Sequence, residues 1–196
     1  MKDYRWTVSG PWDKGCKETE TEWKMEVEGD VCYVAFKGST SSLDWKQNFS
    51  FWVKPYKGQE SLWFAHAGFV KKWKSIRDEV YNTVLSNDIK IIEIYGFSQG
   101  GAIATLCHED FIFNKKDVLV NTFVYGAPRV IWVFNYRKIK ERFMNLNRME
   151  FTSDIVTKVP PVFMGYIHVG ERIKKKHKLL MFFWNFKKIH MSYKDF

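Results

Sequence analysis

Residues 90–106, which read KIIEIYGFSQGGAIATL, decide the fold. An apolar, β-rich run ends at Tyr95, a glycine-rich segment follows it, and a run of small apolar residues comes next. These features predict a strand, a tight turn and a buried helix. The turn carries the pattern Gly96-x-Ser98-x-Gly100, which is typical of a nucleophile elbow.

The chemistry of such a turn explains its spacing. A serine attacks an ester only when its Oγ projects from a strained turn, and side chains two residues away on either side would collide with the neighbouring backbone. Glycine is therefore expected at positions 96 and 100. The helix after Ser98 directs unpaired N–H groups toward a developing negative charge. The pattern alone leaves one alternative, a glycine-rich turn with a surface serine.

Length and composition set the class of protein. The 196 residues suit a single domain, residues 1–196, with a sizeable core. Hydrophobic residues make up 45% and charged residues 27%, which is typical of a globular protein. The net charge of +9 favours an anionic partner such as a lipid surface. No nucleic-acid-binding motif accompanies this charge, so we expect no nucleic-acid partner.

The three cysteines show no metal or redox spacing, so we expect no disulfide framework, metal or cofactor. The first ten residues lack the apolar core of a signal peptide. No apolar run reaches the roughly 20 residues that span a bilayer. These features predict a cytoplasmic protein, with release by cell lysis as the alternative.

The order of the remaining segments predicts the architecture. Residues 1–20 are polar and are expected to pack loosely, whereas residues 21–28 alternate and residues 31–36 are apolar, as in a hairpin. An amphipathic helix is expected at 68–85, a buried strand at 118–125, a helix at 135–144 and short strands at 149–152, 166–173 and 179–184. This order predicts an α/β fold with a mixed, mostly parallel central sheet and helices on both faces.

A serine nucleophile needs a base, and the base needs an acid that orients it. In hydrolases with this elbow the acid and then the histidine follow the serine along the chain. Asp154 follows a predicted strand and is the favoured acid, with Asp110 and Asp117 as competitors. Position alone does not separate the three candidate bases, which are His168, His177 and His190.

Further short segments accompany the elbow in a fixed order. They are FKGS at 36–39, DW at 44–45, HAGF at 66–69, GAPR at 126–129, SDIV at 153–156, VPP at 159–161, YIHVGE at 166–171 and HMSY at 190–193. Together they resemble the class 3 lipase family, the group of the fungal triacylglycerol lipases, from about residue 21 to the C-terminus. The resemblance implies an α/β-hydrolase fold.

Residue by residue, the resemblance implies that Ser98 is the nucleophile, Asp154 the orienting acid and His190 the base. The N–H groups of Ser39 and Gln99 would form the oxyanion hole. The implied activity is that of a serine ester hydrolase, a lipase or esterase that cleaves acylglycerols or related lipid esters through an acyl-enzyme. A phospholipase acting on glycerophospholipid esters and a non-catalytic lipid-binding module are the alternatives.

The sequence departs from the family pattern at two positions, where Lys37 replaces an arginine and Phe97 replaces a histidine. Neither position belongs to the implied triad.

Two segments are candidates for contact with lipid. Leu43, Trp45 and Phe49 lie in the segment expected to form a small lid over the substrate, with a short helix packed on the core as the alternative. The apolar residues 179–184 follow the basic residues 172–178. This combination favours peripheral contact with an anionic membrane surface, and a core strand is the alternative.

Overall fold

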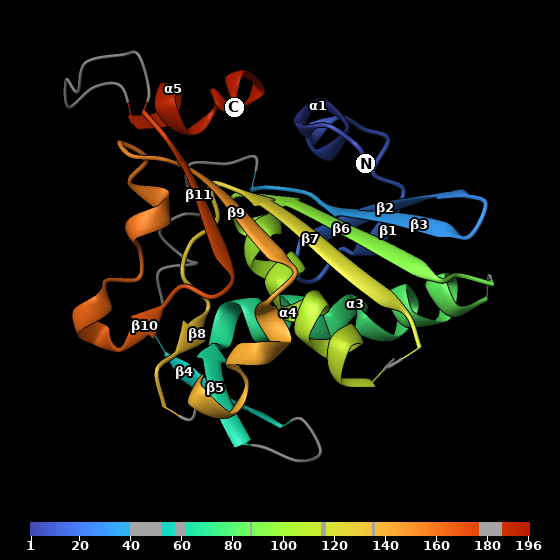
Figure 1. Cartoon of the computed structure of the whole chain (residues 1–196), viewed down its shortest axis with the longest axis horizontal. Helices are drawn as coiled ribbons and strands as arrows, with labels where there is room; N and C mark the ends of the chain where they lie inside the picture. The colour runs from blue at the N-terminus through green and yellow to red at the C-terminus, as the bar shows by residue number, and fades with distance from the viewer. Residues whose placement is uncertain (40–51, 58–61, 87, 115–116, 135, 177–185) are drawn as a thin grey trace.

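A seven-stranded sheet in the order β1-β2-β3-β6-β7-β9-β11 forms the centre of the structure, a computed structural model (Figure 1). The structure describes residues 1–39, 52–57, 62–86, 88–114, 117–134, 136–176 and 186–196. The strands are β1 (Lys14–Cys16), β2 (Thr21–Glu28), β3 (Val31–Phe36), β6 (Ile91–Phe97), β7 (Leu119–Tyr125), β9 (Leu146–Phe151) and β11 (Glu171–Lys175). The strands from β3 to β11 run parallel, and β1 and β2 are antiparallel. The predicted mixed, mostly parallel sheet is confirmed.

Helices cover both faces of this sheet (Figure 1). The long helices α3 (Ala67–Leu85) and α4 (Gln99–Asn114) lie on one face, and the short helices α1 (Tyr4–Val8) and α5 (Phe186–His190) lie on the other. Helix α4 is buried from Gln99 to Phe111, because β6, β7 and α3 surround it. Helix α3 buries the apolar stripe that its sequence predicts and exposes its lysines Lys71 and Lys74.

A second, four-stranded sheet has the order β10-β8-β5-β4. Its strands are β4 (Val53–Lys57), β5 (Leu62–His66), β8 (Ile131–Trp132) and β10 (Tyr166–Ile167). The single strand predicted at 166–173 is wrong, because it divides into β10 and β11 in different sheets. Gly170 lies between them at φ 75°, where a Cβ would stand 2.3 Å from the Leu146 carbonyl oxygen.

The expectation that residues 1–20 pack loosely is wrong. Strand β1 pairs with β2, and the Tyr4 side chain of α1 is buried. Lys24 is also buried, because its ammonium group donates to the carbonyl oxygens of Trp6 at 2.5 Å and Ser9 at 2.8 Å. Polar contacts and single aromatic rings hold this segment, so no continuous apolar run marks it in the sequence.

Short 3₁₀ helices replace the helix predicted at 135–144. They are η1 (Tyr136–Lys138) and η2 (Lys140–Phe143), and η3 (Val156–Lys158), η4 (Val162–Met164) and η5 (Tyr193–Asp195) follow later in the chain. Within the described ranges, no helix combines the length and the apolar character that crossing a bilayer requires. Leu43, Trp45, Phe49 and residues 179–184 lie outside the described residues.

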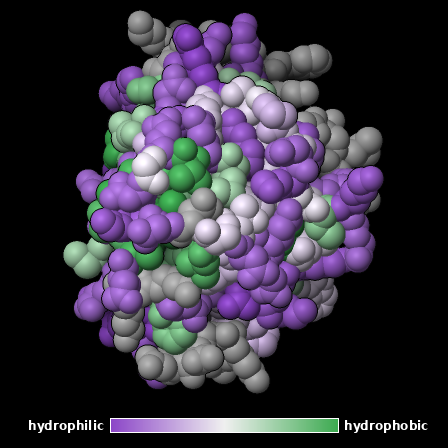
Figure 2. All heavy atoms as spheres, turned by 90° about the vertical axis from the view of Figure 1, so that its right-hand side faces the viewer, coloured by the Kyte–Doolittle hydropathy of each residue, from purple (hydrophilic) through white to green (hydrophobic). Residues whose placement is uncertain are grey.

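The right-hand side of the molecule in Figure 1, where the β2–β3 turn lies, is mainly hydrophilic (Figure 2). A group of hydrophobic residues interrupts this surface. The exposed large hydrophobic side chains of the protein include Val27 in β2, Leu85 in α3 and Leu119 in β7. The parallel strands begin on this side, so their carboxyl ends, where the loops discussed next are found, point the other way (Figure 1).

Candidate active site

Ser98 occupies a sharp turn between β6 and α4. Its φ of 55° lies in the left-handed region, which costs a non-glycine residue of order 1 kcal/mol and is frequent at functional sites. The Ser98 N–H donates to the Tyr125 carbonyl oxygen at 2.9 Å, and its carbonyl oxygen accepts from the Gly101 N–H at 3.0 Å. The first bond ties the turn to the end of β7, and the second begins the helical pattern of α4.

The glycines around Ser98 are required by close backbone approaches. A Cβ on Gly96 would lie 2.3 Å from the Gly100 carbonyl oxygen. A Cβ on Gly100 would lie 2.0 Å from the carbonyl oxygen of Phe36, at the end of β3. The predicted reason for glycine at both positions, collision with neighbouring backbone, is confirmed.

Asp154 and His190 form a buried pair at the carboxyl edge of the sheet. His190 Nδ1 donates to Asp154 Oδ2 at 2.8 Å, and the Val156 N–H donates to Asp154 Oδ1 at 2.9 Å. Asp154 is 0% exposed and His190 is 5% exposed. The bond from Nδ1 fixes the orientation of the imidazole ring.

Tyr193 also bonds to Asp154. Its hydroxyl donates to Asp154 Oδ2 at 2.8 Å and accepts from the Phe151 N–H at 3.1 Å. Burial, followed by the nearby Asp154 carboxylate, raises the pKa of Tyr193, so the phenol keeps its proton. The motif at 190–193 contains Tyr193, but it does not predict the contact of Tyr193 with the acid. The three-residue spacing between His190 and Tyr193 is the sequence signal that indicates their proximity.

Two contacts bring the Asp154–His190 pair next to Ser98. Phe97, the residue before the serine, stacks on the His190 imidazole with ring centroids 4.7 Å apart and planes at 27°. Gly126 follows Tyr125, whose carbonyl holds Ser98, and a Cβ on it would lie 3.0 Å from His190 Cε1. The three predicted residues thus gather around the ends of β6, β7 and β9.

The competing histidine His168 makes structural contacts. His168 Nε2 donates to the Thr157 carbonyl oxygen at 2.7 Å, and burial together with nearby Arg148 lowers its pKa to about 3. Thr157 in turn donates its hydroxyl to the Asp154 carbonyl oxygen at 3.0 Å. His168 therefore supports the acid loop in its neutral form. His177 lies outside the described residues.

The competing aspartates stand away from the serine. Asp110, in α4, accepts from Tyr56 at 2.9 Å and from Trp73 at 2.7 Å, and Arg77 approaches it at 2.8 Å. These contacts belong to the core between α3 and α4. Asp117 is exposed in the turn before β7.

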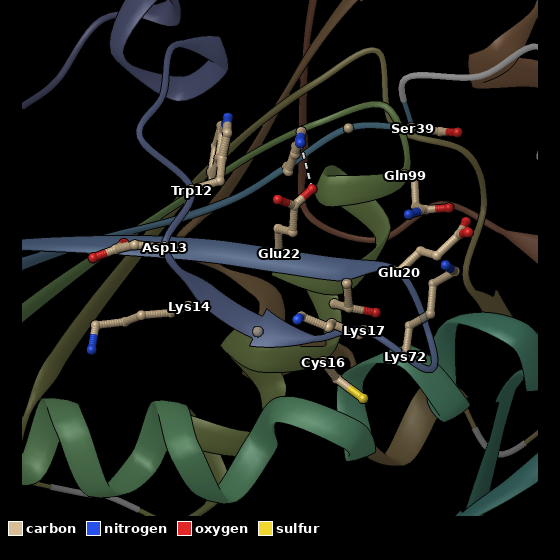
Figure 3. A pocket seen from close by; sticks show the side chains of 14 residues that line it. Trp12, Asp13, Lys14, Cys16, Lys17, Glu20, Glu22, Ser39, Lys72 and Gln99 are labelled. Atoms are coloured by element: carbon tan, nitrogen blue, oxygen red, sulfur yellow. Dashed lines mark hydrogen bonds and ion pairs between the residues drawn. The ribbon is translucent and has the colours of Figure 1, made fainter.

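The two proposed oxyanion residues come from neighbouring segments. Gln99 is the first residue of α4, and Ser39 follows β3, whose last residue Phe36 pairs with Gly96. Both line a cleft of about 530 Å³ (Figure 3). Lys37, which departs from the family pattern, forms an ion pair with Glu22.

All three cysteines are free, and Cys32 and Cys107 are fully buried. Across the part of the chain that the structure describes, no group of three or more His, Cys, Asp or Glu residues is arranged to hold a metal ion.

Comparisons with known proteins agree with this geometry. A family model described as lipase (class 3) matches residues 33–164. The secreted mono- and diacylglycerol lipase A of Penicillium cyclopium is 31% identical over 141 residues, which cover 70% of this chain and 45% of that protein. A lipase of Rhizomucor miehei is 29% identical over 158 residues, 75% of this chain and 43% of that protein. The chain thus spans less than half the length of these curated relatives.

The solved structures show the same fold. The crystal structure of a lipase from Rhizopus microsporus var. chinensis superimposes with a TM-score of 0.75 and 23% identity. The match covers 85% of this chain and 61% of that one. The predicted α/β-hydrolase fold is therefore confirmed.

The expectation of a cytoplasmic protein is contradicted, because the Penicillium relative is named as a secreted protein. The expectation depended on the first ten residues and on the odd number of cysteines. Buried cysteines such as Cys32 and Cys107 act as small apolar side chains, and they carry no information about the compartment.

The family match covers more than half of the chain and contains both Ser98 and Asp154. His190 lies beyond the matched residues, but its side chain bonds to Asp154 in the folded chain. The chain belongs to the class 3 lipase family.

Proposed function

We propose that the chain is a serine ester hydrolase that cleaves acylglycerols or related lipid esters through an acyl-enzyme on Ser98. The observation that carries this proposal is the 2.8 Å bond between His190 Nδ1 and Asp154 Oδ2, in a pair packed against Phe97 and Gly126. A histidine oriented in this way beside a serine in a strained turn is the arrangement that activates a hydroxyl.

The reaction follows from these positions. His190 Nε2 takes the Ser98 proton as Oγ forms a bond to the ester carbonyl carbon. The tetrahedral intermediate then breaks its bond to the alcohol, which leaves with the proton from His190. Water attacks the acyl-enzyme, gives its proton to His190, and the acid is released as Ser98 regains a proton.

The N–H groups of Ser39 and Gln99 would stabilise the oxyanion of each tetrahedral intermediate. A donor of this kind contributes about 100- to 1,000-fold to the rate. The position of the Gln99 N–H at the start of α4 supports this role, because the helix dipole favours negative charge there.

The free-energy cost of burying the Asp154–His190 pair argues against a non-catalytic lipid-binding module. Burying a carboxylate is unfavourable unless charged or hydrogen-bonding partners satisfy it. Asp154 is fully buried and is supplied with three donors, from His190, Tyr193 and Val156. A binding surface needs none of these groups in this arrangement.

Labelling by a fluorophosphonate probe and hydrolysis of a short p-nitrophenyl ester test the proposal. The wild-type chain should label at Ser98, and Ser98→Ala should neither label nor hydrolyse. His190→Gln should lose at least about 1,000-fold in rate, whereas the matched variant His168→Gln should retain most of it. A Ser98→Ala variant that keeps more than about a tenth of the activity contradicts the assignment.

We further propose that the chain contacts an anionic lipid surface peripherally. The segment after Asp154 carries exposed Ile155, Val162 and Phe163, the last of them 89% exposed, and β11 presents exposed basic residues. The chain should co-sediment with anionic vesicles more than with zwitterionic ones, and Phe163→Ser should reduce this binding. Equal sedimentation with both vesicles would contradict the role of charge.

A further inference from the structure

A cleft of about 530 Å³ extends from the proposed oxyanion residues Ser39 and Gln99 to strand β1 (Figure 3). Trp12 and Asp13 lie at its far end, and Glu20 and Lys72 lie near Gln99. Ser98 does not line this cleft. The cleft therefore begins where the ester carbonyl would be held and leads away from the nucleophile.

The lining of the cleft is charged, which is unusual for a lipid-binding site. Its charged side chains are Lys14, Lys17, Lys37 and Lys72 together with Asp13, Glu20 and Glu22. An acyl chain placed here would remove these groups from water without offering a hydrogen bond, which is unfavourable. The cleft is thus suited to the polar, alcohol side of an ester.

The charges near Gln99 have both signs. The Lys72 ammonium group donates to the Thr19 carbonyl oxygen at 2.5 Å, which holds the lysine in place on the cleft wall. Glu20 and Lys72 point into the same part of the cleft (Figure 3). Lys37 and Glu22 pair with each other, whereas the charged ends of Glu20 and Lys72 lie together near Gln99 (Figure 3).

The backbone at Glu20 supports a role in binding. Its φ of 49° lies in the left-handed region, and the only other non-glycine residue with a positive φ among those that the structure describes is Ser98. Strain of this kind persists where surrounding structure imposes it, and it is concentrated at functional sites. The turn at Glu20 presents an exposed carboxylate beside Lys72.

We propose that this cleft binds a head group that carries both a phosphate and an ammonium group, so that the preferred substrate is a zwitterionic glycerophospholipid. Lys72 would hold the phosphate, and Glu20 would hold the ammonium. The proposal rests on the proposed function, because the ester carbonyl must lie between Ser39, Gln99 and Ser98. The acyl bond is cleaved as described above, and the product that leaves through the cleft is the lysophospholipid.

Soluble short-chain substrates below their aggregation concentrations separate head-group recognition from surface binding. The wild-type chain should hydrolyse dihexanoylphosphatidylcholine with a lower KM than dihexanoylglycerol. Lys72→Gln should raise the KM for dihexanoylphosphatidylcholine and dihexanoylphosphatidylglycerol about tenfold and leave that for dihexanoylglycerol unchanged. Lys72→Arg should restore most of the loss.

Two further variants sharpen the test. Glu20→Gln should raise the KM for dihexanoylphosphatidylcholine but not for dihexanoylphosphatidylglycerol, which has no ammonium group. Lys71→Gln is the matched control, because Lys71 neighbours Lys72 on α3 but is exposed and pairs with Glu18 at 3.8 Å. Thermal denaturation checks that each variant folds, and Glu20→Gln, at an exposed side chain, tests the cleft even if Lys72→Gln does not fold.

The outcomes distinguish this inference from the proposed function. A chain that labels with the fluorophosphonate probe yet hydrolyses only dihexanoylglycerol overturns the head-group proposal and leaves the hydrolase in place. An equal effect of Lys71→Gln and Lys72→Gln also overturns it. A chain that does not label at all overturns the proposed function instead.

Discussion

The two faces of the central sheet bury different kinds of side chain. The core between the sheet and helices α3 and α4 is mainly aliphatic, and the buried Asp110 on α4 bonds to Tyr56 and Trp73. The opposite face buries a smaller cluster of rings that includes Tyr4, Phe97 and Tyr193. These rings contact His190 or one another, and the Tyr193 hydroxyl reaches Asp154. The sheet thus separates a face that is mainly aliphatic from a face whose rings contact the Asp154–His190 pair.

The variant with the largest expected effect is Phe111→Ala, which tests the aliphatic face and should lower the stability of the protein. Phe111 in α4 is fully buried and stacks on Tyr81 of α3 with centroids 4.4 Å apart. Phe111→Ala should lower the free energy of unfolding by about 3–5 kcal/mol, because it removes buried area and leaves a cavity. Denaturant unfolding measures this change. Probe labelling of the folded fraction should stay near the wild-type rate.

A matched control for Phe111 is Phe163→Ala, since Phe163 is 89% exposed. That variant should change the unfolding free energy by less than about 0.5 kcal/mol. A folded Phe111→Ala chain that no longer reacts with the fluorophosphonate probe would contradict this difference between the faces. It would show that the aliphatic face also positions the proposed active site.

A smaller effect is expected on the ring face. Tyr193→Phe keeps the ring and removes the hydroxyl, so Asp154 loses one donor and the Phe151 N–H loses its acceptor. We expect a cost of about 1–3 kcal/mol in stability and a fall of about tenfold in kcat with KM unchanged. Steady-state hydrolysis of a soluble ester separates the two parameters.

Tyr81→Phe is the comparison for this variant on the opposite face. Among the described residues, the Tyr81 hydroxyl accepts one long bond, from Asn114 at 3.4 Å, so its removal should leave kcat unchanged. If the two tyrosine variants lose activity equally, the hydroxyl on Asp154 has no special part in orienting His190.

The parts of the fold that were predictable are those with strong local patterns. Continuous apolar strands and the glycines around Ser98 identified the parallel centre, and Ser98 and Asp154 come just after the parallel strands β6 and β9. The four-stranded sheet was not predicted as a unit. Strands such as β8 and β10 have two residues each, too few to show a period.

Other features depend on contacts that no local pattern encodes. Lys24 lies in an alternating strand yet is buried, because carbonyl groups of residues 6 and 9 satisfy its ammonium group. His168 is indistinguishable from His190 in sequence position, and only its bond to the Thr157 carbonyl oxygen identifies it as a supporting residue. The compartment depends on cellular sorting rather than on packing, and the relatives corrected that expectation.

The near contact between Gly100 and the Phe36 carbonyl oxygen has an evolutionary consequence. It joins the exit of β3 to the serine turn, so the spacing between the two proposed oxyanion residues is inherited from the pairing of adjacent strands rather than from any loop. A change in the chain beyond Ser39 that keeps this pairing should therefore leave the two proposed oxyanion residues in place. Substrates can therefore change in such a fold while the arrangement of the proposed oxyanion residues stays the same.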